Sequence, residues 1–227
     1  YVTKLMVDGD QIKATIKSFK SIQTITFGTT LTIGEYVMPK KLSSLIKNHQ
    51  NVQFNMHVEN TESLLMKLDE GIINFAFIEG FFDKTKYGYK PFSKEPFIAV
   101  CSTESPYKEG TYLMTDLLKS PLILREKGSG TRAIFEEALT DAGHVIDHFK
   151  HIIEIGNIKA IKTLVQKNHG ISFMYQAAVQ EELNNKTLHK IALKDFNMVR
   201  QFNFVYNKTS LFKTQTLEWF EVINALK

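Results

Sequence analysis

Hydrophobic residues follow two spacings along this chain, one typical of β-strands and one typical of α-helices, and segments of the two kinds alternate. Apolar and polar side chains alternate strictly over residues 52–58, which is the period of a β-strand. Residues 36–49 and 61–71 instead repeat their apolar side chains every three or four positions, as one face of a helix does. Pro39 is expected to kink the first of these helices or to mark its true start, because proline cannot donate the backbone hydrogen bond of a helix interior.

The same pattern continues along the chain as strands separated by helices. We expect strands at residues 24–27, 52–58, 73–80, 120–126, 151–155, 171–175 and 201–208, and two more within 86–101. Helices are expected at 1–20, 36–49, 61–71, 157–170 and 214–226, and a loop followed by a helix at 128–143. A β-α-β-α-β order occurs twice, at 23–78 and 121–175, which is typical of mostly parallel sheets. The sequence therefore predicts an α/β protein with two lobes and a cleft between them.

Composition changes this picture little. The 227 residues are 43% hydrophobic and 23% charged, as in an ordinary globular protein, and no apolar run approaches the roughly 20 residues that cross a bilayer. The net charge is +4 without a long run of Lys or Arg, which does not by itself indicate nucleic-acid binding. The chain opens on Tyr1 without a signal-peptide pattern, and we expect a fragment or a processed product. The single cysteine, Cys101, ends an apolar strand and is expected to be a small buried side chain.

Small hydroxyl and glycine residues gather at two corners where a strand leads into a helix. Thr29, Thr30 and Thr32 occupy the first corner, and residues 128–132 the second. In open α/β sheets, ligands bind at the C-terminal ends of the strands. The first N–H groups of a helix lack internal partners and carry partial positive charge, so both corners suit a small anion. The alternative is that Thr32 and Ser129 only cap their helices.

Other chemistries find less support in the sequence. The glycine-rich run 128–131 is neither a nucleotide phosphate loop nor a three-glycine dinucleotide fingerprint, and no cofactor is expected. His144, His148 and His151 are close in sequence, but one follows a helix-closing glycine and another begins a strand, so they need not converge on a metal. No Ser-His-Asp order, paired carboxylates or HExxH motif is visible, and no enzyme activity is expected.

Several stretches resemble the effector-binding domain of LysR-type transcriptional regulators. Residues 26–80 resemble its first lobe, residues 95–107 its crossover strand and the following loop, and residues 121–143 and 156–183 its second lobe. The resemblance covers roughly residues 21–225. It is strongest in the branch that regulates sulfur assimilation, including the control of sulfite reductase.

The resemblance implies a two-lobed, type-2 periplasmic-binding-protein fold. Residues 1–20 would end the linker helix that follows a winged helix-turn-helix domain absent from this chain. Lobe I would comprise 21–103 and 208–227, and lobe II 104–207. The resemblance also implies a homodimer, a tetramer for the full-length protein, DNA contact only through the missing domain, no membrane contact and a cytoplasmic location.

The resemblance further implies where the effector binds. In sulfate-responsive members, hydroxyls that match Thr30 and Thr32, and one near Ser129, hold the anion. Glu79 departs from this pattern, in which a small hydroxyl residue faces the anion after the third strand. A carboxylate pointing into the cleft would repel an anion or would require a protonated or cationic group on the ligand. The candidate ligand-binding residues are Thr30, Leu31, Thr32, Ile33, Glu79, Ser129, Gly130, Thr131, Arg132 and Asn157.

The leading hypothesis is a non-enzymatic domain through which a transcription factor senses a small anionic effector, a sulfur oxyanion or a small acid. The main alternative is an extracytoplasmic solute-binding protein of an ABC transporter, which should be monomeric. The amphipathic helix expected at 1–20 argues against that alternative. An enzyme that uses the same cleft, such as a dehydratase or a deaminase, is the third class considered.

Overall fold

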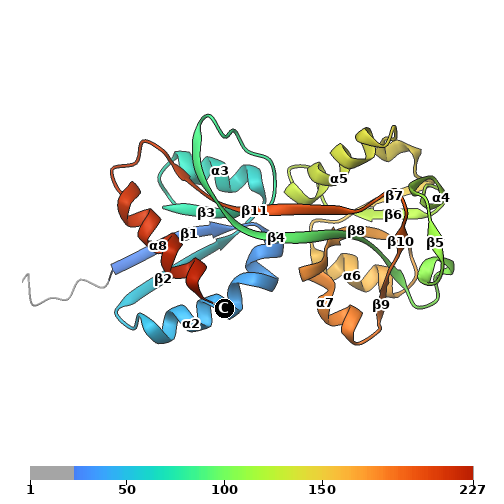
Figure 1. Ribbon diagram of the computed structural model, residues 1–227, viewed down its shortest axis with the longest axis horizontal. Coiled ribbons are helices and arrows are strands. Elements are labelled where there is room, and N and C mark those ends of the chain that lie inside the picture. Colours follow the sequence, from blue (N-terminus) through green and yellow to red (C-terminus); the bar gives the residue numbers. More distant parts are fainter. Residues whose placement is uncertain (1–22, 227) are drawn as a thin grey trace, which may run out of the picture.

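Two lobes lie side by side in this protein and are joined by two long strands (Figure 1). The structure is a computed structural model that describes residues 23–226. The helix expected at 1–20 lies outside the described residues. None of the helices in the described part combines the length and the hydropathy of a membrane span.

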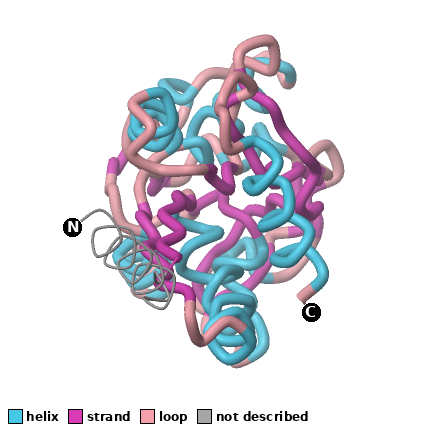
Figure 2. The backbone as a smooth tube through the Cα atoms, turned by 90° about the vertical axis from the view of Figure 1, so that its left-hand side faces the viewer, coloured by secondary structure: helices cyan, strands magenta, loops and turns pink. Residues whose placement is uncertain are grey.

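Lobe I is built on three parallel strands with β1 in the centre. The strands are β1 (Gln23–Thr29), β2 (Val52–Val58) and β3 (Phe75–Ile78), and the helices are α2 (Met38–Asn48), α3 (Thr61–Asp69) and α8 (Lys213–Ala225). Successive side chains of a strand point to opposite faces of the sheet. Phe75 and Phe77 therefore pack in the core that α2 and α8 cover, and Ala76 and Ile78 pack in the core that α3 covers. The view in Figure 2 shows the helices arranged around the strands.

Lobe II repeats this arrangement with its own parallel strands. The strands are β6 (Pro121–Leu124), β7 (His151–Glu154) and β8 (Ser172–Tyr175), and the helices are α4 (Met114–Leu117), α5 (Gly130–Asp141), α6 (Ile158–Gln166) and α7 (Gln176–Asn184). β6 pairs with β7, and a parallel bridge between Leu122 and Ile171 links it to the start of β8. Shorter elements complete the lobe: η2 (Pro106–Lys108), β5 (Thr111–Tyr112), η3 (Ile146–His148), β9 (Leu188–Lys190) and β10 (Ala192–Leu193).

Two strands run through both lobes, β4 (Tyr87–Ser102) and β11 (Met198–Asn207), and they pair with each other antiparallel (Figure 1). They join the lobes into one sheet with the order β2-β1-β3-β11-β4-β8, with β9 also on β4. The parallel pairing expected within each lobe is confirmed for β1 with β2 and β3 and for β6 with β7, and the crossing strands add antiparallel pairs. The predicted lobe boundaries at 103/104 and 207/208 stay predictions, and the described chain passes between the lobes within β4 and β11.

The prediction of two strands within residues 86–101 is wrong, because β4 is one continuous strand of 16 residues. Pro91 and Pro96 lie opposite Asn203 and Val199 of β11, and the register of the pairing shifts beside Asn203. β8 and β9 pair with β4 only from Phe97 onward. Both prolines thus stand where β4 has a partner on one side, and there the missing N–H donor is tolerated.

The first helix begins at Leu31, earlier than the expected residue 36. Its turn from Ile33 to Val37, η1, is π-helical, and the Met38 N–H donates to the Ile33 carbonyl. Pro39 has no N–H for the carbonyl four residues before it, which explains the widened turn. The regular helix α2 starts directly after this turn, at Met38, as the proline indicated.

Candidate functional site

The first corner predicted from the sequence lies at the end of β1. Thr29, Thr30 and Thr32 are 0%, 1% and 1% exposed, although each carries a hydroxyl group. The Thr30 N–H donates to the Phe77 carbonyl of β3 at 3.0 Å, which fixes the corner against the neighbouring strand. Thr32 makes no capping hydrogen bond within the described chain. The alternative that Thr32 serves as a helix cap therefore has no support in the geometry.

The second corner follows β6 in lobe II. Residues 125–129 lead from the strand into α5, and Gly128 adopts φ +85°, a conformation that favours glycine. Ser129 is 3% exposed and stands at the N-cap position of α5, yet its hydroxyl makes no capping hydrogen bond to the described residues. Both corners thus bury hydroxyl groups that their own helices do not use.

Glu79 lies where the two lobes meet. The Thr131 hydroxyl of lobe II donates to Glu79 Oε1 at 2.6 Å, and the Tyr175 hydroxyl donates to the Glu79 backbone carbonyl at 3.2 Å. The Glu79 side chain comes from the end of β3 in lobe I and is 3% exposed. The carboxyl group therefore points into the boundary between the lobes. In this position it is expected, from the sequence, to repel an anion or to require a protonated or cationic group on the ligand.

Burial raises the pKa of Glu79 above its usual range. The hydroxyls of Thr131, Thr32 and Thr30 act in the opposite direction, as does the Arg125 guanidinium, because all of them favour the charged carboxylate. Of these groups, the Thr131 hydroxyl forms a hydrogen bond of ordinary geometry to Glu79, and the others lie near the carboxyl group. Two of these hydroxyls, at Thr30 and Thr32, are the groups that the sequence predicts as donors to an anion.

Several polar atoms near this carboxyl group lack a hydrogen-bond partner within residues 23–226. They are the hydroxyls of Thr30 and Thr61, Nη1 of Arg125 and Oε2 of Glu79. The exposed fractions of these four side chains are between 1% and 6%. Buried polar groups are nearly always hydrogen-bonded in native proteins. The site therefore offers donors and one acceptor to a small molecule that both accepts and donates hydrogen bonds.

Two glycines let the lobes approach closely beside Glu79. A Cβ atom added to Gly130 would lie 2.7 Å from the Gly80 Cα, and one added to Gly80 would lie 2.8 Å from the Gly130 Cα. Any side chain at either position would force the backbones apart. The Thr61 hydroxyl lies at the same place, 2.7 Å from the position of the Cβ on Gly80.

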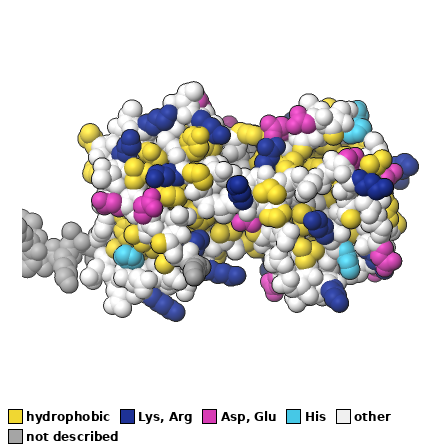
Figure 3. Space-filling model, viewed as in Figure 1, with side chains coloured by type: hydrophobic (Ala, Val, Ile, Leu, Met, Phe, Trp, Pro, Cys, Tyr) yellow, Lys and Arg dark blue, Asp and Glu magenta, His cyan; other side chains and the backbone are white. Residues whose placement is uncertain are grey.

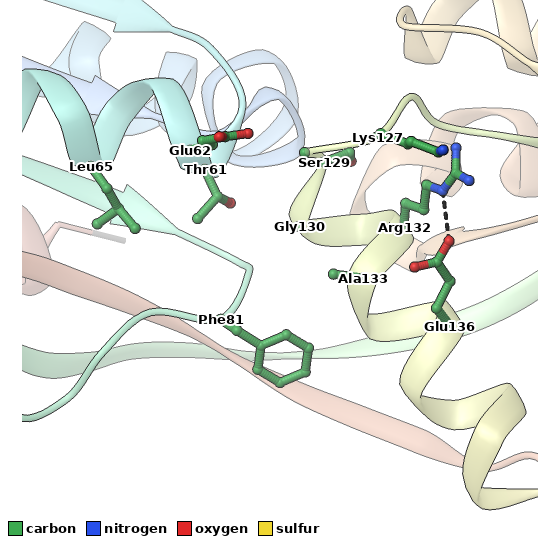
Figure 4. A pocket seen from close by; sticks show the side chains of 11 residues that line it. Thr61, Glu62, Leu65, Phe81, Lys127, Ser129, Gly130, Arg132, Ala133 and Glu136 are labelled. Atoms are coloured by element: carbon green, nitrogen blue, oxygen red, sulfur yellow. Dashed lines mark hydrogen bonds and ion pairs between the residues drawn. The ribbon is translucent and has the colours of Figure 1, made fainter.

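A cavity of about 380 Å³ opens beside this contact (Figure 4). One wall comes from α3 and the other from the start of α5, with the Phe81 ring between them. The lining residues are Thr61, Glu62, Leu65, Phe81, Lys127, Gly128, Ser129, Gly130, Arg132, Ala133 and Glu136. A smaller cavity of about 160 Å³ also reaches Phe81 and is lined by Glu79, Arg200 and Asn203 among others. Cavities thus adjoin the lobe boundary at Glu79 and Gly80 on more than one side.

Four predicted site residues have other contacts in the structure. Ile33 is fully buried in the lobe I core, and Leu31 packs against a lobe II core cluster. Arg132 forms ion pairs with Glu136 at 2.8 Å and Glu154 at 2.5 Å, so its charge is already compensated. Asn157 is exposed, and its side chain caps α6 by accepting from the Ala160 N–H. The geometry brings the other six together: Thr30, Thr32, Glu79, Ser129, Gly130 and Thr131.

The sequence reasoning missed Arg125, Thr61 and Tyr175. Arg125 follows directly after the apolar strand β6 and is only 4% exposed, with its Nε and Nη2 bonded to Glu126. A charged residue at the C-terminal end of a buried parallel strand is a signal that the sequence does carry. Thr61 and Tyr175 reach the site only because two distant segments pack together, and local spacing does not reveal that.

The histidines considered as a metal site do not form one among the described residues. The rings of His144 and His148 lie 5.8 Å apart, and His151 is exposed at the start of β7. In the part of the chain that the structure describes, no three His, Cys, Asp or Glu side chains are arranged to hold a metal ion. Cys101 is buried, as expected from its position in an apolar strand.

Two α/β lobes joined by two crossing strands are the architecture of the periplasmic-binding-protein-like fold. The family described as LysR substrate binding domain matches residues 21–225. The chain therefore belongs to the LysR family of transcriptional regulators, and it is the regulatory, effector-binding domain rather than an enzyme.

Similar proteins agree with this assignment. The chain is 27% identical over 162 residues to the HTH-type transcriptional regulator YeiE of Escherichia coli and 21% identical over 184 residues to CysL of Bacillus subtilis, covering 71% and 81% of this chain. It spans 54% and 60% of the length of these relatives. Among solved structures, the regulatory domain of CcmR from Synechocystis, in complex with 2-PG, superposes with a TM-score of 0.80 at 19% identity, over 89% of this chain and 96% of that one.

Proposed function

We propose that this domain senses a small anion that also carries a hydrogen-bond donor. The anion would bind between the lobes, at the corner formed by Thr30 and Thr32 and at the start of α5. The observation that carries the proposal is the Glu79 carboxyl group, which is buried among hydroxyls suited to an oxyanion. Its Oε2 is an acceptor without a partner in the described chain, and the Thr30 hydroxyl and Arg125 Nη1 are donors without one.

In its charged form, Glu79 requires a hydrogen-bond donor on the ligand. Two unit charges of the same sign about 4 Å apart repel by roughly 4 kcal/mol at an effective dielectric constant of 20. A proton between the ligand and the carboxylate forms a charge-assisted hydrogen bond, which offsets this repulsion. Hydrogensulfite, hydrogenphosphate and small hydroxy or amino acids meet this requirement, whereas sulfate at neutral pH does not.

Relatives support a small acid or a sulfur oxyanion as the ligand. The CcmR regulatory domain was solved with 2-PG, and the effector-binding domain of QuiR was solved with shikimate. CysL of Bacillus subtilis is among the curated relatives, at 21% identity. Sulfur oxyanions with an exchangeable proton are therefore the first candidates.

The whole protein would be a cytoplasmic transcriptional regulator. This domain would form a homodimer, and the full-length protein would form a tetramer. DNA contact would belong to a part of the protein outside this chain. Lys and Arg side chains are dispersed among acidic and apolar ones over the face shown in Figure 3, without the continuous basic surface of a DNA-binding domain. Effector binding would change the angle between the lobes or their packing in the dimer, and so reposition the distant DNA-binding domains.

Calorimetric titration tests the anion site directly. Wild type, Thr32→Val and Ser129→Ala are titrated with sulfite, sulfate, thiosulfate, phosphate and small carboxylates. A hydrogen bond to a charged ligand is worth about 1.5–3 kcal/mol, so Thr32→Val should weaken binding about tenfold to a hundredfold. If the hydroxyl serves only a hydrogen bond within the folded chain, affinity stays unchanged and the variant loses about 1 kcal/mol of stability. Failure of every probe to bind wild type would contradict the proposed anion site.

Glu79→Gln tests the need for a donor. The substitution removes the negative charge and supplies an amide donor, so the affinity for sulfate should rise relative to that for sulfite by at least about tenfold. Glu62→Gln is the matched control, because this exposed carboxylate lines the neighbouring cavity but does not face the buried hydroxyls. An unchanged sulfate-to-sulfite ratio in Glu79→Gln would show that Glu79 does not select the ligand.

A further inference from the structure

A buried ammonium group of lobe II faces an aromatic ring of lobe I. Lys162 lies on α6 and is 7% exposed. Its Nζ donates to the Ala178 carbonyl at 2.9 Å and forms an ion pair with Glu182 Oε1 at 2.6 Å, both on α7. The Tyr36 ring of lobe I lies over the same ammonium, with 4.6 Å between Nζ and the ring centroid.

A buried charge needs partners on all sides, and lobe II supplies two of them. Removing an ammonium from water is costly unless hydrogen bonds and an opposite charge replace the solvent. Ala178 and Glu182 provide the carbonyl and the carboxylate, and Tyr36 provides the ring face. Cation–π contacts are strongest when they are desolvated, as this one is. The Tyr36 ring of lobe I therefore helps to stabilise the buried Lys162 ammonium of lobe II.

The Tyr36 phenol stays neutral in this position. Burial raises its pKa most, and the carboxylates of Glu35 and Glu182 raise it further. The ring thus keeps its uncharged, electron-rich face toward Lys162 at neutral pH. The contact depends on where the ring stands and not on a titration.

Tyr36 is linked to the candidate anion site through a short helical segment. It lies in the π-helical turn η1, which follows Thr32 directly in the chain. The Gly34 N–H donates to the Thr30 carbonyl at 2.8 Å, so the turn is hydrogen-bonded to the corner itself. Leu31 and Tyr36 both pack against the lobe II cluster that contains Ile161 and Val179. One short helical segment thus carries the corner hydroxyls on one side and contacts α6 and α7 on the other.

We propose that the contact between Tyr36 and Lys162 positions the two lobes relative to each other and transmits a change at the Thr30 and Thr32 corner to lobe II. The positioning role stands on the geometry alone, and the transmission rests on the proposed function. The π-helical turn holds one residue more than an α-helical turn and lies between the corner and the regular helix α2, so a shift of the corner acts on this turn first. A ligand that shifts the corner would move the Tyr36 ring across the ammonium, and the lobes would follow.

Distances between spin labels on the two lobes test the positioning role without an effector. Lys47→Cys on α2 and Glu181→Cys on α7 are exposed attachment sites, and the native Cys101 is buried away from the reagent. The distance distribution is measured by pulsed EPR in three backgrounds: the otherwise unchanged chain, Tyr36→Phe and Tyr36→Leu. Tyr36→Phe keeps the ring and should leave the distribution unchanged, whereas Tyr36→Leu should broaden or shift it.

A charge-removed background shows whether the ammonium matters. Lys162→Met combined with Glu182→Gln removes both charges without leaving one of them buried and unpaired. In this background, Tyr36→Leu should cause no further change in the distribution. Tyr36→Leu with an unchanged distribution, or Tyr36→Phe with the same change as Tyr36→Leu, would overturn the positioning role. An equal effect of Tyr36→Leu with and without the charges would overturn the role of Lys162.

Adding sulfite as the probe tests the transmission. Sulfite should change the distance distribution of the labelled chain, and this change should be lost in Tyr36→Leu while calorimetry still detects sulfite binding. Retention of the full sulfite-induced change in Tyr36→Leu would overturn the transmission. If sulfite does not bind the unchanged chain, the proposed anion site fails for this probe, and the effector-free distances still decide the positioning role.

Discussion

The contribution of the Glu79 side chain to the free energy of unfolding depends on pH. Burial raises its pKa, and the surrounding hydroxyls and Arg125 do not fully offset this effect. An acid with a raised pKa in the folded state binds its proton more tightly there than in the unfolded chain. Ionisation at neutral pH therefore lowers the free energy of unfolding, and this loss disappears below the ordinary pKa of glutamate, where both states are protonated.

Glu79→Gln should therefore raise the free energy of unfolding at neutral pH. The gain should shrink as the pH falls through the raised pKa toward about 4, the ordinary range of glutamate. Urea unfolding at a series of pH values, followed by the fluorescence of Trp219, the single tryptophan, measures this. Glu62→Gln, at an exposed position, should change stability little at any pH. A gain that is the same at acidic and neutral pH would contradict the explanation.

At the scale of elements, spacing along the chain predicted most helices and strands but not their interruptions. α3 is capped by Asn60, whose Oδ1 accepts from the Ser63 N–H, and Gly71 follows the helix at φ +71°. The continuity of β4 was missed because Pro91 and Pro96 read locally as breaks. Their tolerance depends on which side of β4 is paired, and pairing is a property of the assembled sheet.

The same limit applies to the candidate site. Thr30, Thr32 and Ser129 were predicted as site residues because each lies at the corner after a strand, which is a local feature. The hydrogen bond between Thr131 and Glu79 joins residues 52 positions apart, on different lobes, and follows from how the lobes pack. Asn157 also stands at a helix start, yet there the geometry is that of a cap.

Gly130→Ala should separate the lobes at the start of α5. The added Cβ would meet the Gly80 backbone at 2.7 Å, while Gly130 itself has no positive φ that would exclude alanine. The Thr131 hydroxyl would lose its bond to Glu79, and the affinity for the bound probe should fall at least about tenfold. Calorimetry measures the affinity, and small-angle X-ray scattering measures the separation.

Gly156→Ala is the control for this substitution. Its Cβ would meet only the Glu126 side chain, at 3.6 Å, which is ordinary contact. This variant should keep the affinity of wild type. Equal affinities for Gly130→Ala and Gly156→Ala would show that the close glycine contact does not shape the site.

At the scale of the whole molecule, lobe I leaves apolar side chains at its outer edge. β2 ends the sheet order, and Val58 on this strand is 36% exposed. Ile46 on α2 and Met66 on α3 are 55% and 54% exposed. An edge strand with apolar neighbours is a natural surface for a second chain. The resemblance to LysR regulators implies that such a surface pairs with lobe II of a partner.

We therefore expect this domain to be a dimer in solution at tens of micromolar. Ile46→Glu should weaken the dimer by about tenfold or more, because fully burying an isoleucine is worth about 1.5–3 kcal/mol. Leu211→Glu is the control, since Leu211 is 96% exposed in the loop before α8 and away from this edge. Sedimentation velocity distinguishes the species. A single species of 26.0 kDa for the unchanged chain would contradict the expectation.

The place of β11 in the sheet has a consequence for how the chain is made. β11 lies between β3 and β4, although more than ninety residues of sequence follow β4 before β11 begins. On the ribosome, lobe I therefore stays without an inner strand until lobe II has been synthesised, and β3 and β4 present open edges during that time. The lobe II elements from β5 to β10 are synthesised in this interval. The strands β3 and β4 cannot pair with β11 until this strand is made. A nascent chain halted before residue 198 should therefore depend on chaperones to avoid aggregation.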